Sequence, residues 1–230
     1  MSMIDLHTHV GDVEMPSPVM AASGTFGYGL EYDGLVDWAK VGAVSVKGLS
    51  VDTWPGHPAP RMVETPAGML NAIGLQNVGV EQFLREKLPA LRKLGPRVVA
   101  NCWGNTAEEY RAVVERLDAA EGIDAIELNL ACPNTREWNP PPSACPRETA
   151  ELVTLARRTT NKPLWVKLTP NVTDITEIAR AAEGAGADAL SLINTLKGMV
   201  IDVRSRTPAL THVTGGLSGP AIRPVALCLV

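Results

Sequence analysis

The sequence predicts an α/β fold in which short buried strands alternate with amphipathic helices around a parallel sheet. Six brief apolar runs, each bounded by Gly, Pro or Asn, are typical of strands covered on both faces. Helical patterns separate the later runs, and six βα units within 230 residues indicate one α/β domain rather than two. The predicted strands are Pro18–Ala22, Ala43–Lys47, Arg97–Asn101, Ile123–Asn129, Pro163–Leu168 and Asp188–Asn194.

Local signals justify the remaining elements in order. Ile4–Met15 precedes the first strand as a predicted hairpin with its turn at Gly11-Asp12. Thr106–Glu121 carries an apolar stripe at helical spacing, and Thr106 with Glu109 three residues later fits a capping box. Glu148–Thr160 and Thr173–Gly186 are predicted helices of the same kind.

Two connections are longer than a βα turn needs. Gly48–Gly79 is rich in Pro and Gly, and Thr195–Gly219 is the second such connection. Within the latter, Thr214–Pro220 is a glycine cluster before a helix. It is interpreted as a turn or, less commonly, as a cradle for a phosphate at a helix N-terminus.

Composition excludes several classes of protein. Apolar residues make up 45% of the chain and charged residues 20%, which is enough to build a core and argues against disorder. The net charge of −4 disfavours nucleic-acid binding, and no apolar run approaches the roughly 18 residues of a membrane span. Met1–Val10 is no signal peptide, because Asp5 and two histidines interrupt it. The four cysteines form no CxxC pair, so reduced thiols and a cytoplasmic location are expected.

Polar side chains stand where the predicted strands end. In α/β folds ligands bind outside the carboxyl ends of the strands, so these positions are candidate site residues. Buried lysines are costly unless each meets an anion or a carbonyl, and amides suit a planar ligand with both donors and acceptors. The set is Ser23, Lys47, Gly48, Asn101, Asn129, Lys167, Asn194 and Thr195.

Cys132 is the candidate reactive group of this set. It follows the fourth strand in a loop with Pro133 and Asn134, and a thiol of lowered pKa could there act as a base beside a carbonyl. Cys102 and Cys228 fit the commoner role of a small buried apolar residue, and Cys145 that of a surface or structural residue.

Seven segments resemble class 1 dihydroorotate dehydrogenases almost from end to end, in order and with coherent spacing. The block Asn71–Asn77 and the segment Leu196–Leu210 look most like the NAD-linked branch, which works with an iron–sulfur, FAD-carrying partner subunit. The segments are Ala22–Gly29, Val46–Gly48, Glu64–Asn77, Asn129–Asn134, Val166–Asn171, Ile193–Thr195 and Gly215–Pro220.

The resemblance implies a (β/α)8 TIM barrel, one FMN-binding domain over residues 1–230, that oxidises dihydroorotate to orotate in pyrimidine synthesis. Carried over by position, Cys132 is the general base. FMN contacts would come from Ser23, Lys47, Gly48, Asn101, Asn129, Lys167, Ile193 and Gly219. Substrate contacts would come from Lys47, Asn71, Ala72, Ile73, Gly74, Leu75, Asn129, Asn134, Asn194 and Thr195. No metal site is implied, and a homodimer core with two electron-transfer subunits is expected as the assembly.

Two departures from the family pattern bear on these expectations. Thr135–Pro146 replaces the usual Val-Lys and Gly-rich continuation of a loop that lies over the substrate in the family. About six βα units use the whole chain, so an intact barrel should approach 300 residues, and 230 is expected to be an incomplete length lacking the last two units.

Three other functions stay open at this point. A dihydropyrimidine dehydrogenase-like or other FMN barrel enzyme would act on a related ring. The pair His7 and His9 resembles the His-x-His of metal-dependent amidohydrolases, although two exposed residues of a hairpin is the favoured interpretation. A non-catalytic remnant acting as a binding or scaffold protein is the third.

Overall fold

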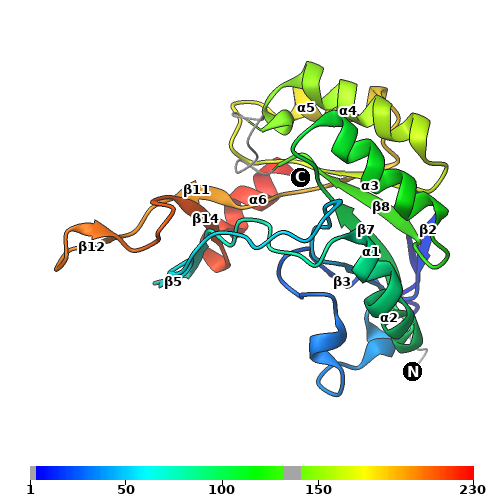
Figure 1. Cartoon of the computed structure of the whole chain (residues 1–230), viewed down its shortest axis with the longest axis horizontal. Helices are drawn as coiled ribbons and strands as arrows, with labels where there is room; N and C mark the ends of the chain where they lie inside the picture. Colours follow the sequence, from blue (N-terminus) through cyan, green and yellow to red (C-terminus); the bar gives the residue numbers. More distant parts are fainter. Residues whose placement is uncertain (1–3, 132–140) are drawn as a thin grey trace.

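A parallel six-stranded sheet forms the centre of the molecule. The computed structural model describes residues 4–131 and 141–230. The sheet runs in the order β3-β4-β7-β8-β9-β10, so the chain adds each strand beside the preceding one, as in one side of a barrel (Figure 1). Its strands are β3 (Met20–Ala21), β4 (Ala43–Ser45), β7 (Arg97–Cys102), β8 (Ala125–Asn129), β9 (Leu164–Lys167) and β10 (Ala189–Ser191). All six predicted strands and the α/β class are confirmed.

Successive residues of each strand face opposite sides of this sheet. Val98, Ala100 and Cys102 of β7 pack in the large core beneath the helices, whereas Val99 packs in a second cluster on the inner face with Ala125. The period of two is thus visible even though β7 and β8 are buried along nearly their whole length. Side chains of the inner face are the ones able to meet inside a curved sheet.

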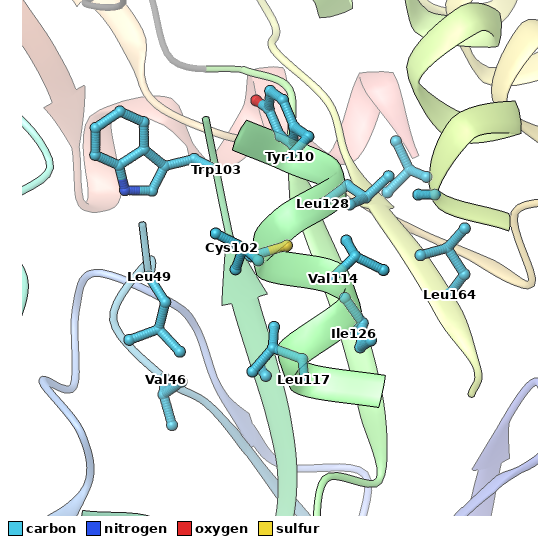
Figure 2. Packing of buried hydrophobic residues seen from close by; sticks show 14 of the residues in the cluster. Val46, Leu49, Cys102, Trp103, Tyr110, Val114, Leu117, Ile126, Leu128 and Leu164 are labelled. Atoms are coloured by element: carbon cyan, nitrogen blue, oxygen red, sulfur yellow. The ribbon is translucent and has the colours of Figure 1, made fainter. Parts of the chain in front are cut away.

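Helices cover the outer face. After β4 come α1 (Val80–Gln82), a π-helical turn (Phe83–Lys87) and α2 (Leu88–Leu94), and then each of the next three strands is followed by one helix. Figure 2 shows α3 lying over β7, with Tyr110, Val114 and Leu117 in the same buried cluster as Ile126 and Leu128. The three later helices are α3 (Ala107–Ala119), α4 (Pro146–Thr159) and α5 (Ile175–Gly184).

The predicted capping box at the start of α3 is confirmed in one half only. The hydroxyl of Thr106 accepts a hydrogen bond from the Glu109 amide at 3.2 Å. The Glu109 carboxylate accepts from the Asn105 amide at 2.7 Å instead of returning to that of Thr106. The reciprocal bond is therefore displaced by one residue toward the N-terminus.

The N-terminal hairpin closes the amino ends of the strands. β1 (Thr8–Val10) and β2 (Val13–Met15) pair with Gly11-Asp12 as the turn, as predicted. Val13 and Met15 are buried against the inner-face cluster that contains Ala43 and Trp165. The amino end of the inner face is therefore filled with apolar side chains.

The two long connections form a second, antiparallel sheet that lies to one side of the parallel sheet (Figure 1). Its order is β11-β14-β6-β5, so segments nearly 150 residues apart pair directly, with Leu70 opposite Leu217. The strands are β5 (Met62–Thr65), β6 (Gly68–Asn71), β11 (Leu196–Gly198) and β14 (Gly215–Ser218), with a small ribbon of β12 (Ile201–Asp202) and β13 (Thr207–Pro208) beyond them.

The interpretation of Thr214–Pro220 as a turn or phosphate cradle is wrong. Gly215–Ser218 is strand β14, paired on both sides by β6 and β11, so its amides serve the sheet. The glycines are needed because a Cβ on Gly215 would lie 2.6 Å from the Asn71 carbonyl oxygen. The helical segments that follow are Pro220–Ile222 and α6 (Arg223–Leu229). Other short helical turns are Leu30–Tyr32, Trp38–Lys40 and Pro142–Ala144.

Candidate active site

A cavity of about 290 Å³ opens on the inner face of the parallel sheet, toward the carboxyl ends of β3, β8, β9 and β10. Three of the predicted cofactor residues, Ser23, Lys167 and Ile193, line it together. Glu127 and Ser191 line it as well, and neither was among the predicted site residues. The remaining walls are apolar: Val10, Met20, Ala22, Trp165, Leu190 and Leu192.

Lys167 places a cation in this cavity. Its side chain ends β9 and is only 9% exposed, and within residues 4–131 and 141–230 no ion pair or hydrogen bond engages its ammonium. A buried ammonium without a partner is costly, so the site fits a ligand that brings an anionic or strongly polar group. Ser23 is held nearby, its hydroxyl donating to the Val46 carbonyl at 2.8 Å.

Glu127 places an anion beside the same cavity. The carboxylate is 2% exposed and accepts hydrogen bonds from Ser45 Oγ at 2.9 Å, from Asn101 Nδ2 at 2.5 Å and from Ser191 Oγ. A sequence signal for it existed, because Glu127 stands two residues before Asn129 in the same strand and so faces the same side of the sheet.

Gly48 and Asn101, two of the residues predicted to contact FMN, lie side by side. A Cβ on Gly48 would lie 2.7 Å from Asn101 Oδ1, so only glycine fits beside this amide. Asn101 is fully buried, and its Oδ1 has no hydrogen-bond partner among the described residues. Lys47 reaches the same neighbourhood: its ammonium would lie 3.9 Å from a Cβ on Gly24, and its amide donates to the Gly27 carbonyl at 2.9 Å.

Asn129 ends β8 directly opposite Lys167 of β9. It is 7% exposed, its carbonyl accepts from the Tyr110 hydroxyl at 2.8 Å, and its Oδ1 accepts from the Ala131 amide at 3.4 Å. These two bonds fix the strand end from which the predicted Cys132 loop departs.

The predicted substrate segment 71–75 leaves the antiparallel sheet at the end of β6. Asn71 Nδ2 donates to the Gly216 carbonyl at 3.3 Å, and the His57 amide donates to the Ile73 carbonyl at 3.0 Å. Gly74 and Leu75 both have positive φ, 72° and 61°, which gives the segment a tight bend against His57. Ala72, the remaining member of the segment, is buried, and its amide donates to the Arg61 carbonyl.

Asn194 and Thr195 connect the two sheets. The Asn194 amide donates to the Leu168 carbonyl at 3.0 Å, and Asn194 Oδ1 accepts from the Thr195 amide at 2.8 Å. The Thr195 side chain fills the space above Gly216, the residue whose carbonyl binds Asn71. The structure therefore brings the predicted substrate residues 71 and 195 to neighbouring positions.

The other predicted residues lie apart or outside the described part of the chain. Gly219 (φ 102°) follows β14 and does not line the cavity; a Cβ at this position would lie 2.8 Å from Gly68 Cα. Cys132 and Asn134 fall outside the described residues.

The cysteines differ in environment. Cys102 is fully buried as predicted, and burial first, then the charge of Glu127, raises its pKa far above the ordinary range. Cys145 is half-buried. The prediction for Cys228 is wrong, because it is exposed on α6. Its neighbour Leu229 packs on the core, and adjacent helical residues point about 100° apart.

The N-terminal histidines are exposed on the hairpin, and His7 lies 3.7 Å from the equally exposed Glu14. Over the described residues, no three His, Cys, Asp or Glu side chains gather as metal ligands do. Nor does the described part of the chain contain a helix with the length and apolar character to cross a bilayer.

Comparison with known proteins identifies the family to which the chain belongs. The family model for dihydroorotate dehydrogenase matches residues 5–230. A protein of Geotalea daltonii named dihydroorotate dehydrogenase B (NAD(+)), catalytic subunit, is 52% identical over 230 residues, covering all of this chain and 75% of that protein. Proteins of the same name from Geotalea uraniireducens and Desulforamulus reducens are each 52% identical, over 98% and 97% of this chain and 74% of their own length.

The matches extend over both sheets and include every described segment on which the resemblance rested. Together with the side-by-side parallel strands and the polar cavity at their carboxyl ends, they show that the chain belongs to the dihydroorotate dehydrogenase family.

Proposed function

We propose that residues 1–230 form one FMN-binding domain that oxidises dihydroorotate to orotate in pyrimidine synthesis. The observation that carries the proposal is the buried Lys167 ammonium, which lines one cavity with Ser23 and Ile193 and lacks a partner among the described residues. A flavin gains negative charge on reduction, and a cation in its pocket stabilises that charge.

The residues present fit FMN. Besides Lys167, the buried Asn101 Oδ1 is an acceptor without a donor, and the contact between Gly48 and Asn101 leaves no room for a side chain on that glycine. FMN would be held by Ser23, Lys47, Gly48, Asn101, Asn129, Lys167, Ile193 and Gly219. When bound, FMN supplies the acceptor for the hydride that leaves substrate C6.

The substrate is a ring with one carboxylate, one imide N–H and one amide-type N–H. Lys47 provides a cation, and the amides of Asn71, Asn129, Asn134 and Asn194 provide both donors and acceptors. Thr195 and the backbone of 72–75 complete the set. The proximity of Thr195, Gly216 and Asn71 supports a shared substrate subsite.

Cys132 is proposed as the general base. Its thiolate takes the proton from C5, the electron pair of that C–H bond becomes the C5=C6 double bond, and the hydride departs from C6. Loss of one proton and one hydride accounts for the whole two-electron oxidation. Cys132 therefore only accepts a proton and needs no covalent bond with the substrate.

The relatives' names state a catalytic subunit and NAD(+). We therefore propose the NAD-linked reaction for this chain. A homodimer core would pass electrons to NAD through two partner subunits carrying an iron–sulfur cluster and FAD, in the cytoplasm.

An anaerobic flavin half-reaction tests the proposal. The purified chain loaded with FMN should lose its visible flavin absorption on adding dihydroorotate, and dihydrouracil, the same reduced ring without the carboxylate, should leave that absorption unchanged. Cys132→Ala should bind FMN equally well and barely reduce it, whereas the matched variant Cys145→Ala should behave as the parent. A parent chain that binds no FMN refutes the proposed function, and rapid bleaching in Cys132→Ala refutes the base.

A further inference from the structure

Glu127 is a buried ionisable group that the proposed reaction leaves without a role. It stands in the middle of β8, is 2% exposed, and lines the cavity that also holds Lys167. Burying a carboxylate is costly unless it is hydrogen-bonded, so its presence there needs either a partner set or a function.

Its partners come from three other strands of the sheet. Oε1 accepts from Ser45, the last residue of β4, and from Asn101 of β7, whereas Oε2 accepts from Ser191, the last residue of β10. β9 lies between β8 and β10, and two strand spacings amount to nearly 10 Å along a flat sheet. Glu127 reaches Ser191 across the concave side, and so connects both flanks of the curved sheet beneath the cavity.

These contacts surround the carboxylate with three neutral donors. All three partners donate to it, and the two oxygens of a carboxylate are acceptors. The Cys102 thiol is affected by the same charge, because Glu127 contributes to its raised pKa. No ion pair joins Glu127 to Lys167 in the described residues, so the ammonium stays available to a ligand.

The same contacts orient Asn101. Because Nδ2 donates to Glu127, Oδ1 points toward Gly48, where it stands as an acceptor without a donor among the described residues. A flipped amide would bring Oδ1 against the carboxylate, two acceptors in contact. Glu127 therefore fixes the polarity that Asn101 offers to a ligand.

We propose that Glu127 is a positioning residue of the cofactor pocket, which fixes Ser45, Asn101 and Ser191 and whose negative charge lowers the reduction potential of the bound flavin. The inference rests on the proposed function, because it takes the ligand of this cavity to be FMN. Lys167 and Glu127 then act in opposite directions on the negative charge that reduction adds.

The test measures the midpoint potential and the affinity of bound FMN in the full chain. Glu127→Gln keeps the shape and removes the charge, so the equilibrium constant for two-electron reduction should rise about tenfold, or roughly 30 mV. Lys167→Gln should change it in the opposite direction. Glu127→Asp keeps the charge and shortens the reach, so FMN should bind several-fold more weakly at a potential near that of the parent. Glu115→Gln, an exposed glutamate of α3, is the matched control and should change neither.

If Glu127 only maintained packing, its substitution would weaken FMN binding, and the midpoint potential could shift in either direction. An unchanged or lower potential in Glu127→Gln therefore overturns the inference. If that variant does not fold or bind FMN, the midpoint potential of Ser45→Ala tests the inference instead. It removes one donor without touching the cavity lining, and should lower the potential; an unchanged or higher value overturns the inference. If the parent chain binds no FMN, both the proposed function and this inference are refuted. If the parent binds FMN and Glu127→Gln has the same midpoint potential as the parent, the inference alone is refuted.

Discussion

Substituting Gly48 by alanine tests the close packing on which the candidate cofactor site depends. An added Cβ would lie 2.7 Å from Asn101 Oδ1 and 3.3 Å from Trp103 Cδ1, whereas ordinary contact begins at 3.4 Å. The Asn101 amide would have to retreat by about 0.7 Å, yet its Nδ2 is held by Glu127 at 2.5 Å and its side chain is fully buried.

Gly48→Ala should lower the free energy of unfolding, because it overpacks a site whose neighbours are held in place. Forcing an extra methyl group into such a position destabilises a protein by about 1–3 kcal/mol. For a chain of this size each kcal/mol lowers the melting temperature by roughly 2–4 °C. Gly48→Ala should therefore melt roughly 2–12 °C lower. Because Asn101 Oδ1 is displaced from its place beside residue 48, FMN affinity should fall about tenfold, the equivalent of about 1.4 kcal/mol.

Differential scanning fluorimetry and FMN fluorescence titration measure the two effects. Gly184→Ala is the matched control, because a Cβ at this last residue of α5 meets nothing within 4 Å. That variant should be neutral or up to about 1 kcal/mol more stable, since alanine is the better helix former. A Gly48→Ala chain with the parent's melting temperature and FMN affinity would show that Asn101 moves freely and that Glu127 does not hold it.

Three further predictions follow from single groups. Thr106→Ala removes the hydroxyl that caps α3 and should cost about 1 kcal/mol in denaturant unfolding; a loss below a few tenths of a kcal/mol would mean that water replaces the cap. Burial and a raised pKa should protect Cys102 from iodoacetamide at neutral pH while exposed Cys228 is alkylated, and mass spectrometry showing equal labelling of both would contradict this. Burial first, and then stacked His57, lower the pKa of His212, so the unfolded chain binds this proton more readily and stability should fall as pH drops below about 6.5. Chemical denaturation across pH 5 to 8 should show a weaker pH dependence in His212→Gln, and an identical dependence would exclude His212 as its source.

The parallel sheet was predictable because each of its strands carries its own signal. Runs such as 97–101 and 163–168 are apolar, short and bounded by turn residues, and buried parallel strands need little else. The antiparallel sheet was not predictable in this way. Two of its strands, Gly68–Asn71 and Gly215–Ser218, are short segments that contain glycine and lack a run of β-branched residues, and their pairing joins segments nearly 150 residues apart. Such strands form because distant segments of the chain pair with them, and this pairing cannot be recognised from a short stretch of sequence.

Part of the site was predictable for a related reason. Ser23 and Lys167 were found because polar groups at strand ends stand out against apolar runs, whereas Ile193 came only from the family resemblance. All three line one cavity. Glu127 gave no such signal, because it lies in the middle of a strand and not at its end. Its contacts with Ser45 and Ser191 depend on the curvature of the sheet, which brings three strands around one carboxylate.

On the inner face of the sheet, the side chains of β8 and β9 are apolar at the amino end and polar or charged toward the carboxyl end. This pattern specifies both the strand register and the position of the cavity. On β8 the inward residues pass from Ala125 to Glu127 to Asn129, and on β9 from Trp165 to Lys167. A slip of one residue would turn Glu127 and Lys167 toward the helices and place Ile126 and Val166 in the cavity. Glu127 would then lose its hydrogen bonds and Lys167 its place in the cavity, and burying such a charge without partners costs several kcal/mol per group. The polar residues that line the cavity therefore also exclude the alternative register, and the apolar side chains at the amino end of the same face pack together independently of them.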